Sequence, residues 1–187
     1  MKIDSTNWLA AATLAAIAVF PLAASSSAHA KASIFSPGDN SFSVSFPGKP
    51  TCVQQEAGAP GALFTVHTCA YSQAPARLLY SVTFFTIPPT KVPLDNRRLL
   101  QVAMDGQAAA ANSRVLEVKD VSVGSYPGLQ GVIQDPDGSI TSSQTIVAEG
   151  QLITLVIGDG KKRVAPEVAS NFFSSLKVNR PDSRKRP

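Results

Sequence analysis

The chain has 187 residues, of which 44% are hydrophobic and 16% charged, and its formal net charge at pH 7 is +4. Residues 31–176 hold eleven basic and eleven acidic residues, so the positive excess lies in residues 177–187, where five basic residues accompany one acid, Asp182. A neutral body offers no positive stripe to a phosphate backbone, which excludes nucleic-acid binding as the main role.

The first thirty residues have the order of an export signal. Lys2 lies in a short polar start, residues 8–24 are almost wholly apolar, and Ala28-His29-Ala30 has the A-x-A form of a cleavage site. The competing interpretation is an uncleaved membrane anchor, but Pro21 interrupts an apolar run that is already short for a span. We therefore predict a signal peptide over 1–30, no transmembrane span after processing, and a periplasmic or secreted location.

Removal of this segment leaves a length typical of one domain, predicted over 31–178. The basic tail, 179–187, is predicted to be a disordered, solvated end. The alternative for the tail is contact with anionic lipid or with an acidic partner.

The first elements of the predicted domain are strands. Residues 40–46 alternate apolar and polar side chains, which predicts a half-buried strand that ends at Pro47-Gly48-Lys49-Pro50. Residues 77–87 are rich in β-branched and aromatic residues and predict a buried strand.

Between these strands lie the two cysteines of the chain, Cys52 and Cys69. Their midpoint falls between Pro60 and Gly61, a turn-forming dipeptide, so a hairpin centred there would place the two cysteines opposite each other. An oxidising compartment and an even count then favour a structural disulfide. A reactive or metal-binding pair is the alternative, but the spacing is not C-x-x-C and only one histidine, His67, follows the leader.

The hydrophobic period then changes to that of a helix. Asp95 is suited to cap a helix that ends near Ala111, and Asn112 is suited to the left-handed conformation that follows a helix. One face of this helix carries Leu100, Ala103, Met104, Ala108 and Ala111.

Four more strands and a helix complete the pattern. The strands are expected at 114–123, 129–134, 140–148 and 152–157, and turn signals separate them: Gly124 with Tyr126-Pro127-Gly128, Asp135-Pro136-Asp137-Gly138, and Glu149-Gly150. The last helix spans about 165–175, with Pro166 in its first turn. This order predicts an α+β fold, an antiparallel sheet of about seven or eight strands covered by two helices.

Three segments together resemble the PsbP-like domain of small exported bacterial proteins of unassigned function. They are Phe42-Ser43-Val44-Ser45-Phe46-Pro47-Gly48-Lys49-Pro50, Tyr126-Pro127-Gly128-Leu129-Gln130-Gly131 and Phe172-Phe173-Ser174-Ser175-Leu176-Lys177-Val178. The resemblance covers 40–178 and implies an antiparallel sheet between helices, with a binding or accessory role rather than catalysis. No functional residue is carried over, because none of these positions matches a reactive motif, and a photosynthetic role is not implied.

The candidate chemical groups are few. His67 shares a strand face with Thr65, Cys69 and Tyr71, and sequence spacing places neither a nucleophile nor an orienting carboxylate beside it, so a structural role is expected. The segment 135–139 has turn chemistry rather than the ligand spacing of a calcium loop. Glu117 and Lys119 are expected to form a solvated surface pair.

A basic loop is the remaining candidate. Lys161, Lys162 and Arg163 lie between a buried strand and a helix, where a solvated loop is expected and an anion or acidic-partner contact is the alternative. We predict no catalytic residue, no metal ligand and no cofactor.

Three functional hypotheses follow from these observations. The leading one is an exported, non-enzymatic protein that binds another protein or an envelope component through its sheet edge or loops. The second is a small-ligand carrier or enzyme whose site is assembled in space near His67 and Tyr71. The third is an envelope-surface protein held by its basic tail. The sequence contains no signal for the oligomeric state.

Overall fold

The computed structural model describes residues 32–59, 62–73, 76–89, 95–160 and 162–179. The predicted signal peptide, 1–30, and nearly all of the basic tail lie outside these residues. In chain order the described elements are β1 (Ser33–Phe35), β2 (Phe42–Phe46), β3 (Thr51–Ala59), β4 (Ala62–Gln73), β5 (Leu78–Thr86), α2 (Asn96–Ala110), β6 (Arg114–Val123), β7 (Tyr126–Gln134), β8 (Ile140–Ala148), β9 (Gln151–Gly158), α3 (Pro166–Ser174) and β10 (Lys177–Val178).

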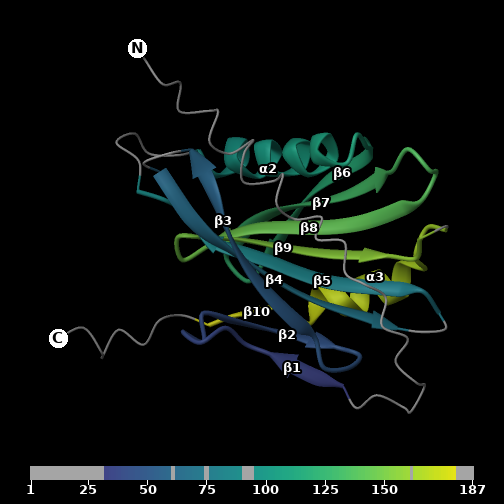
Figure 1. Ribbon diagram of the computed structural model, residues 1–187, viewed down its shortest axis with the longest axis horizontal. Coiled ribbons are helices and arrows are strands. Elements are labelled where there is room, and N and C mark those ends of the chain that lie inside the picture. The colour runs from purple at the N-terminus through teal and green to yellow at the C-terminus, as the bar shows by residue number, and fades with distance from the viewer. Residues whose placement is uncertain (1–31, 60–61, 74–75, 90–94, 161, 180–187) are drawn as a thin grey trace.

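The described strands form two antiparallel sheets. The large sheet has seven strands in the order β3-β4-β5-β9-β8-β7-β6, and the small sheet has three in the order β1-β2-β10. Helix α2 packs on one face of the large sheet, against β6, β7 and β8. Helix α3 and the small sheet cover the opposite face, which gives a layered α+β architecture (Figure 1). The predicted fold class is confirmed.

Helix α2 has the ends that the sequence predicts. The Asp95 side chain accepts a hydrogen bond from the backbone N–H of Arg97 at 3.0 Å. Asn112, just past the helix, has a φ of 52°, in the left-handed region. The helix buries Leu99, Leu100, Ala103, Met104 and Ala108 against the sheet.

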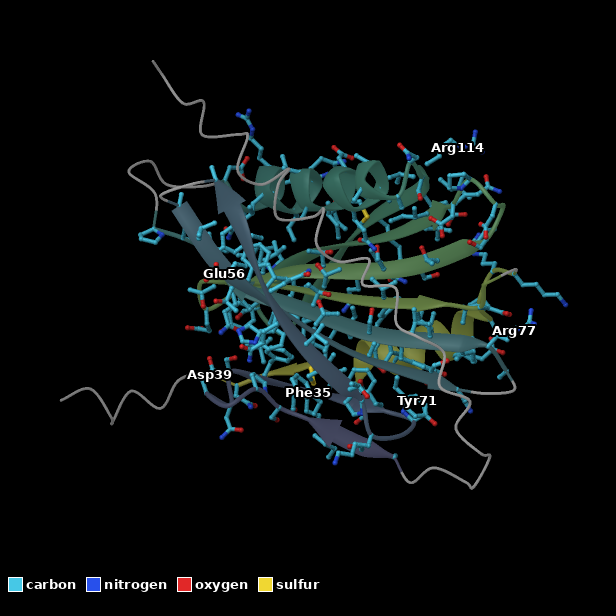
Figure 2. All side chains as sticks on the ribbon, in the orientation of Figure 1. Phe35, Asp39, Glu56, Tyr71, Arg77 and Arg114 are labelled. Atoms are coloured by element: carbon cyan, nitrogen blue, oxygen red, sulfur yellow. A yellow bond between two sulfur atoms is a disulfide. The ribbon has the colours of Figure 1, made fainter. Side chains whose placement is uncertain are left out.

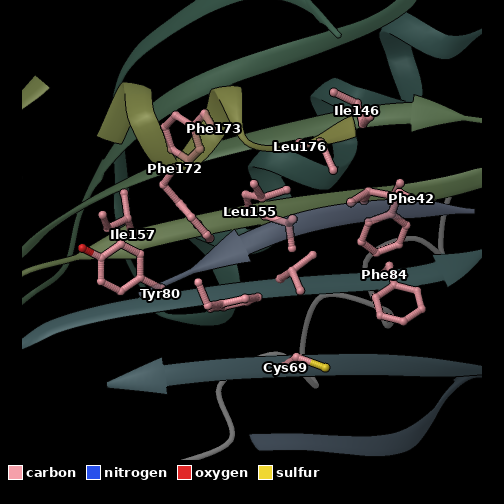
Figure 3. Packing of buried hydrophobic residues seen from close by; sticks show 14 of the residues in the cluster. Phe42, Cys69, Tyr80, Phe84, Ile146, Leu155, Ile157, Phe172, Phe173 and Leu176 are labelled. Atoms are coloured by element: carbon pink, nitrogen blue, oxygen red, sulfur yellow. The ribbon is translucent and has the colours of Figure 1, made fainter. Parts of the chain in front are cut away.

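The opposite face of the large sheet holds an aromatic core (Figure 3). Phe172 and Phe173 of α3 enter this core from one side and Phe42 of β2 from another, while β5 and β9 supply the sheet residues below them. Successive side chains of a strand point to opposite faces, so every second residue of β2 and of β5 brings its side chain to this core.

The structure corrects two details of the predicted fold. Strands β1 and β10 were not predicted, and together with β2 they form a second sheet beside the large one. Tyr126-Pro127-Gly128 was predicted to belong to a turn, but it begins β7, where Pro127 pairs with Ser122 of β6.

Among the described residues no helix combines the length and apolarity needed to cross a membrane.

Candidate binding site beside the disulfide hairpin

The cysteine hairpin forms in the predicted register. Cys52 of β3 lies directly opposite Cys69 of β4, and the two are joined by a disulfide across a Cα–Cα distance of 4.0 Å. The predicted disulfide is therefore confirmed. Because a close Cα approach marks the non-hydrogen-bonded type of antiparallel pair, the backbone groups of Cys52 and Cys69 point away from each other.

The hairpin separates from the rest of the large sheet at His67. Pairing between β4 and β5 runs from Gln73–Leu78 to His67–Phe84 and goes no further in the described structure. Residues 62–66 of β4 continue to pair with β3. Val66 and Phe64 of this stretch join the cluster beneath α2 instead, so a fork opens between the hairpin and β5.

A hollow of about 860 Å³ lies at this fork. Its walls come from the fork itself, from the segment 35–39 that leaves β1, and from Gln151 at the start of β9. The described residues that line it are Phe35, Ser36, Pro37, Gly38, Asp39, Cys52, Val53, Gln54, Phe64, Thr65, His67, Cys69, Phe84, Phe85, Thr86 and Gln151. Asp39 is the only Asp, Glu, Lys or Arg among these described lining residues.

Figure 2 shows how the labelled side chains lie around this region. Phe35, the last residue of β1, and Asp39 lie below the part of β3 that carries Glu56, whereas Tyr71 lies farther along. The hypothesis of a site near His67 and Tyr71 is thus only half matched, because His67 lines the hollow and Tyr71 is not among its described lining residues.

His67 makes a structural contact. Its half-buried ring is stacked on Phe84 of β5, with the ring centroids 4.8 Å apart and an interplanar angle of 10°. Phe84 in turn packs edge-on against Phe42 of β2, with 5.0 Å between centroids. His67 also lines the hollow, so its imidazole is available to contact a molecule that binds there.

Asp39 is held in place by residues distant in sequence. Its carboxylate accepts hydrogen bonds from the Ser41 backbone N–H at 3.0 Å and from the Gln151 side-chain amide at 3.1 Å. Partial burial of the carboxyl acts to raise the pKa of Asp39, but the hydrogen bonds from Ser41 and Gln151 outweigh burial and hold that pKa below its ordinary value. The hollow therefore carries a negative charge at neutral pH.

This lowered pKa gives a prediction for stability against pH. Because the folded protein favours the ionised carboxyl, Asp39 stabilises the fold above its unfolded pKa of about 4, and this contribution is lost as the pH falls through the lower folded value. We expect Asp39→Asn to lower the urea unfolding midpoint at pH 7 and to show a smaller difference from the wild type at pH 3. An equal difference between the two proteins at both pH values would contradict this assignment.

The predicted basic loop lies on another part of the molecule. Lys161 is outside the described residues, and Lys162 is exposed. The Arg163 guanidinium donates two hydrogen bonds of 2.8 Å to the two carboxylate oxygens of Glu117, and this contact lowers the pKa of Glu117. The predicted surface pairing of Glu117 with Lys119 is thus replaced by a pairing with Arg163, while an anion contact at Lys162 stays a prediction.

The segment 135–139 forms a turn, as predicted. The Gly138 backbone N–H donates to the Asp135 carbonyl at 2.9 Å, and the Ser139 hydroxyl donates to the carboxylates of Asp135 and Asp137. Within the described part of the chain no group of three His, Cys, Asp or Glu side chains is placed to hold a metal ion.

Sequence reasoning found His67 but missed Asp39, Gln151 and the phenylalanines around them. Asp39 lies in a short polar turn and Gln151 begins a strand, 112 residues apart, and neither belongs to a recognisable motif. Only the pairing of strands that are remote in sequence brings them together.

The comparisons with known proteins concern the fold. Neither a family model nor a curated protein sequence matches the chain. The solution structure of cyanobacterial PsbP (CyanoP) from Synechocystis sp. PCC 6803 is similar, with a TM-score of 0.53 and 14% sequence identity. The similarity covers 85% of this chain and 99% of that chain, so the PsbP-like fold implied by the sequence resemblance is confirmed.

Proposed function

We propose that this chain is an exported, non-enzymatic protein that binds another protein or a cell-envelope component through the hollow and the strand edge beside it. The observation that carries the proposal is the hollow itself: an open space with aromatic walls and one ionised carboxylate, at the fork of a cross-linked hairpin. Apolar surface with a few placed polar groups is typical of recognition sites.

The use of the reactive groups supports a binding role over catalysis. The two cysteines are joined to each other, and His67 is stacked on Phe84. The carboxylates of Glu117 and Asp120 are paired with Arg163 and Arg97. These groups therefore make contacts with other side chains of the same protein. The disulfide and the leader-like first thirty residues support export.

The test is a site-specific photocrosslinker placed at exposed Val53, which lines the hollow, in cells that express the protein. We expect one defined adduct in the envelope or secreted fraction. The matched control carries the same crosslinker at exposed Gln101 of α2, remote from the hollow, and is expected to give no such adduct. Identical patterns from both positions, or no adduct from either, would remove the support for this function.

A small-ligand carrier or enzyme is the second candidate, because the hollow brings His67 and Asp39 into one lining. His67→Ala separates this candidate from the first. The carrier or enzyme predicts that H67A loses a co-purifying small molecule detected by mass spectrometry, whereas the protein-binding function predicts an unchanged small-molecule profile and a retained crosslinked adduct.

A further inference from the structure

The two edges of the large sheet differ in how they are protected. Edge strand β6 has a register irregularity between Val115 and Glu117, and the charged residues Glu117, Lys119 and Asp120 stand on it. Bulges and charges, lysine above all, are devices that prevent an edge strand from pairing with another chain. Strand β6 is therefore protected against pairing with a strand of another chain.

Edge strand β3 has no such irregularity and carries a single charged residue. All nine of its residues pair with β4 without an irregularity, and β4 is its hydrogen-bonded neighbour in the described large sheet. Its one charged residue is Glu56, and Val53 is 38% exposed. The disulfide to Cys69 holds this edge to the sheet, so its backbone is already ordered before anything binds.

The register identifies the backbone groups that face outward from β3. Cys52 belongs to a non-hydrogen-bonded pair with Cys69, as the 4.0 Å Cα–Cα distance indicates. Its N–H and C=O therefore point to the outer edge, and by alternation so do those of Gln54 and Glu56. These groups form a row of donors and acceptors that an added strand would satisfy.

We propose that β3 is the docking edge for an extended, basic segment of a partner protein, which adds to the large sheet as an eighth strand. The inference rests on the proposed binding function and names its surface and partner class. Every second side chain of the added strand would point to the face that carries Gln54, His67 and Phe84. An apolar side chain opposite Gln54 then reaches the mouth of the hollow.

Charge selects this occupant over a second copy of the chain. The described residues of β3, β4 and β5 include no Lys or Arg, whereas Glu56 on β3 and Asp39 in the lining of the hollow are acids. Two copies joined through β3 would bring four acids to one interface with no cation from these strands. A basic partner segment supplies the opposite charge instead.

The probe is a synthetic nine-residue peptide, Lys-Thr-Val-Thr-Phe-Thr-Val-Thr-Lys, in which the valines and the phenylalanine occupy alternate positions. Binding to the purified protein is measured by calorimetry. Two further peptides carry backbone N-methyl groups on alternate residues, one along each edge of the strand. We expect one of the two to lose at least tenfold in affinity and the other to bind within twofold of the parent peptide, because only one edge faces β3. Equal behaviour of the two methylated peptides would overturn strand addition.

A matched pair of protein variants locates the edge. Gln54→Pro removes an outward N–H that no ladder bond uses, and proline is tolerated at such edge positions. Gln54→Thr keeps that N–H. We expect Q54P to weaken peptide binding at least tenfold and Q54T to change it less than twofold, with thermal midpoints of both near that of the wild type.

The outcomes separate this inference from the proposed function. Peptide binding that Q54P leaves unchanged overturns the β3 assignment, even if the Val53 crosslink to a partner is retained. A concentration-dependent dimer in analytical ultracentrifugation that Q54P abolishes overturns it too, since a second copy would then be the occupant. Loss of affinity on replacing both peptide lysines by norleucine supports the charge argument, and unchanged affinity contradicts it.

Discussion

Phe172→Ala is expected to lower the free energy of unfolding by about 3–5 kcal/mol, which is the usual cost of removing a buried phenylalanine ring. Phe172 is 4% exposed and joins three parts of the fold. Its ring centroid lies 5.7 Å from that of Phe46 in the small sheet and 5.2 Å from that of Tyr80 in the large sheet. Loss of the ring therefore leaves a cavity where α3 and both sheets meet (Figure 3).

Urea denaturation followed by circular dichroism measures this effect, with Ile34→Ala as the control. Ile34 is an apolar side chain that is 74% exposed, so its removal is expected to change the unfolding free energy by no more than about 0.5 kcal/mol. A Phe172→Ala loss below about 1 kcal/mol would mean that the layers do not depend on this contact.

Replacing both cysteines by alanine is expected to cost about 3 kcal/mol, the chain-entropy value for a loop of this size. The two residues are separated by 17 positions, and the bridge restricts the unfolded hairpin much more than the folded one. The Cys69 side chain is buried in the aromatic core, so its shortening adds a small packing loss.

The disulfide prediction is checked by unfolding the wild type and the double variant with and without a reductant. Reductant is expected to lower the wild-type midpoint nearly to that of the variant and to leave the variant unchanged. Hydrogen exchange of β3 should then accelerate more than that of β9, because the cross-link acts on the edge hairpin. A wild type that is insensitive to full reduction would refute a stabilising role for the bridge.

Local signals in the sequence predicted the larger elements well. The cysteine hairpin was placed in its true register because its centre is marked by a turn dipeptide and its arms by equal spacing. The ends of α2 were predicted by Asp95 and Asn112, residues whose side chains and backbone preferences act within a few positions. Such signals are short-range, so one sequence suffices to find them.

The missed features depend on contacts between remote segments. Strands β1 and β10 have three and two residues, too few to show a period of two. Pro127 and Gly128 were assigned to a turn from their residue types, but pairing with β6 holds Pro127 in β7. Glu117 was expected to pair with Lys119, but its carboxylate accepts a bidentate pair of hydrogen bonds from Arg163, which is 46 residues away in the sequence. Among the residues of the candidate site, His67 was identified from the sequence. Asp39 and Gln151 were not identified, because neither belongs to a local sequence motif.

The make-up of the small sheet affects when the molecule can finish folding. Strand β2 is flanked on one side by residues from near the start of the described chain and on the other by Lys177 and Val178 from near its end. A growing polypeptide that is released in order, whether from a ribosome or through a membrane pore, delivers β10 after all the other described strands. Until then one edge of β2 is unpaired, and the hydrogen bond from the Asn179 backbone N–H to the Ser41 carbonyl has not formed. The pairing of β2 with β10, near Asp39, is therefore the last described strand pairing that can form, and a truncation before Lys177 would leave this edge of β2 unpaired.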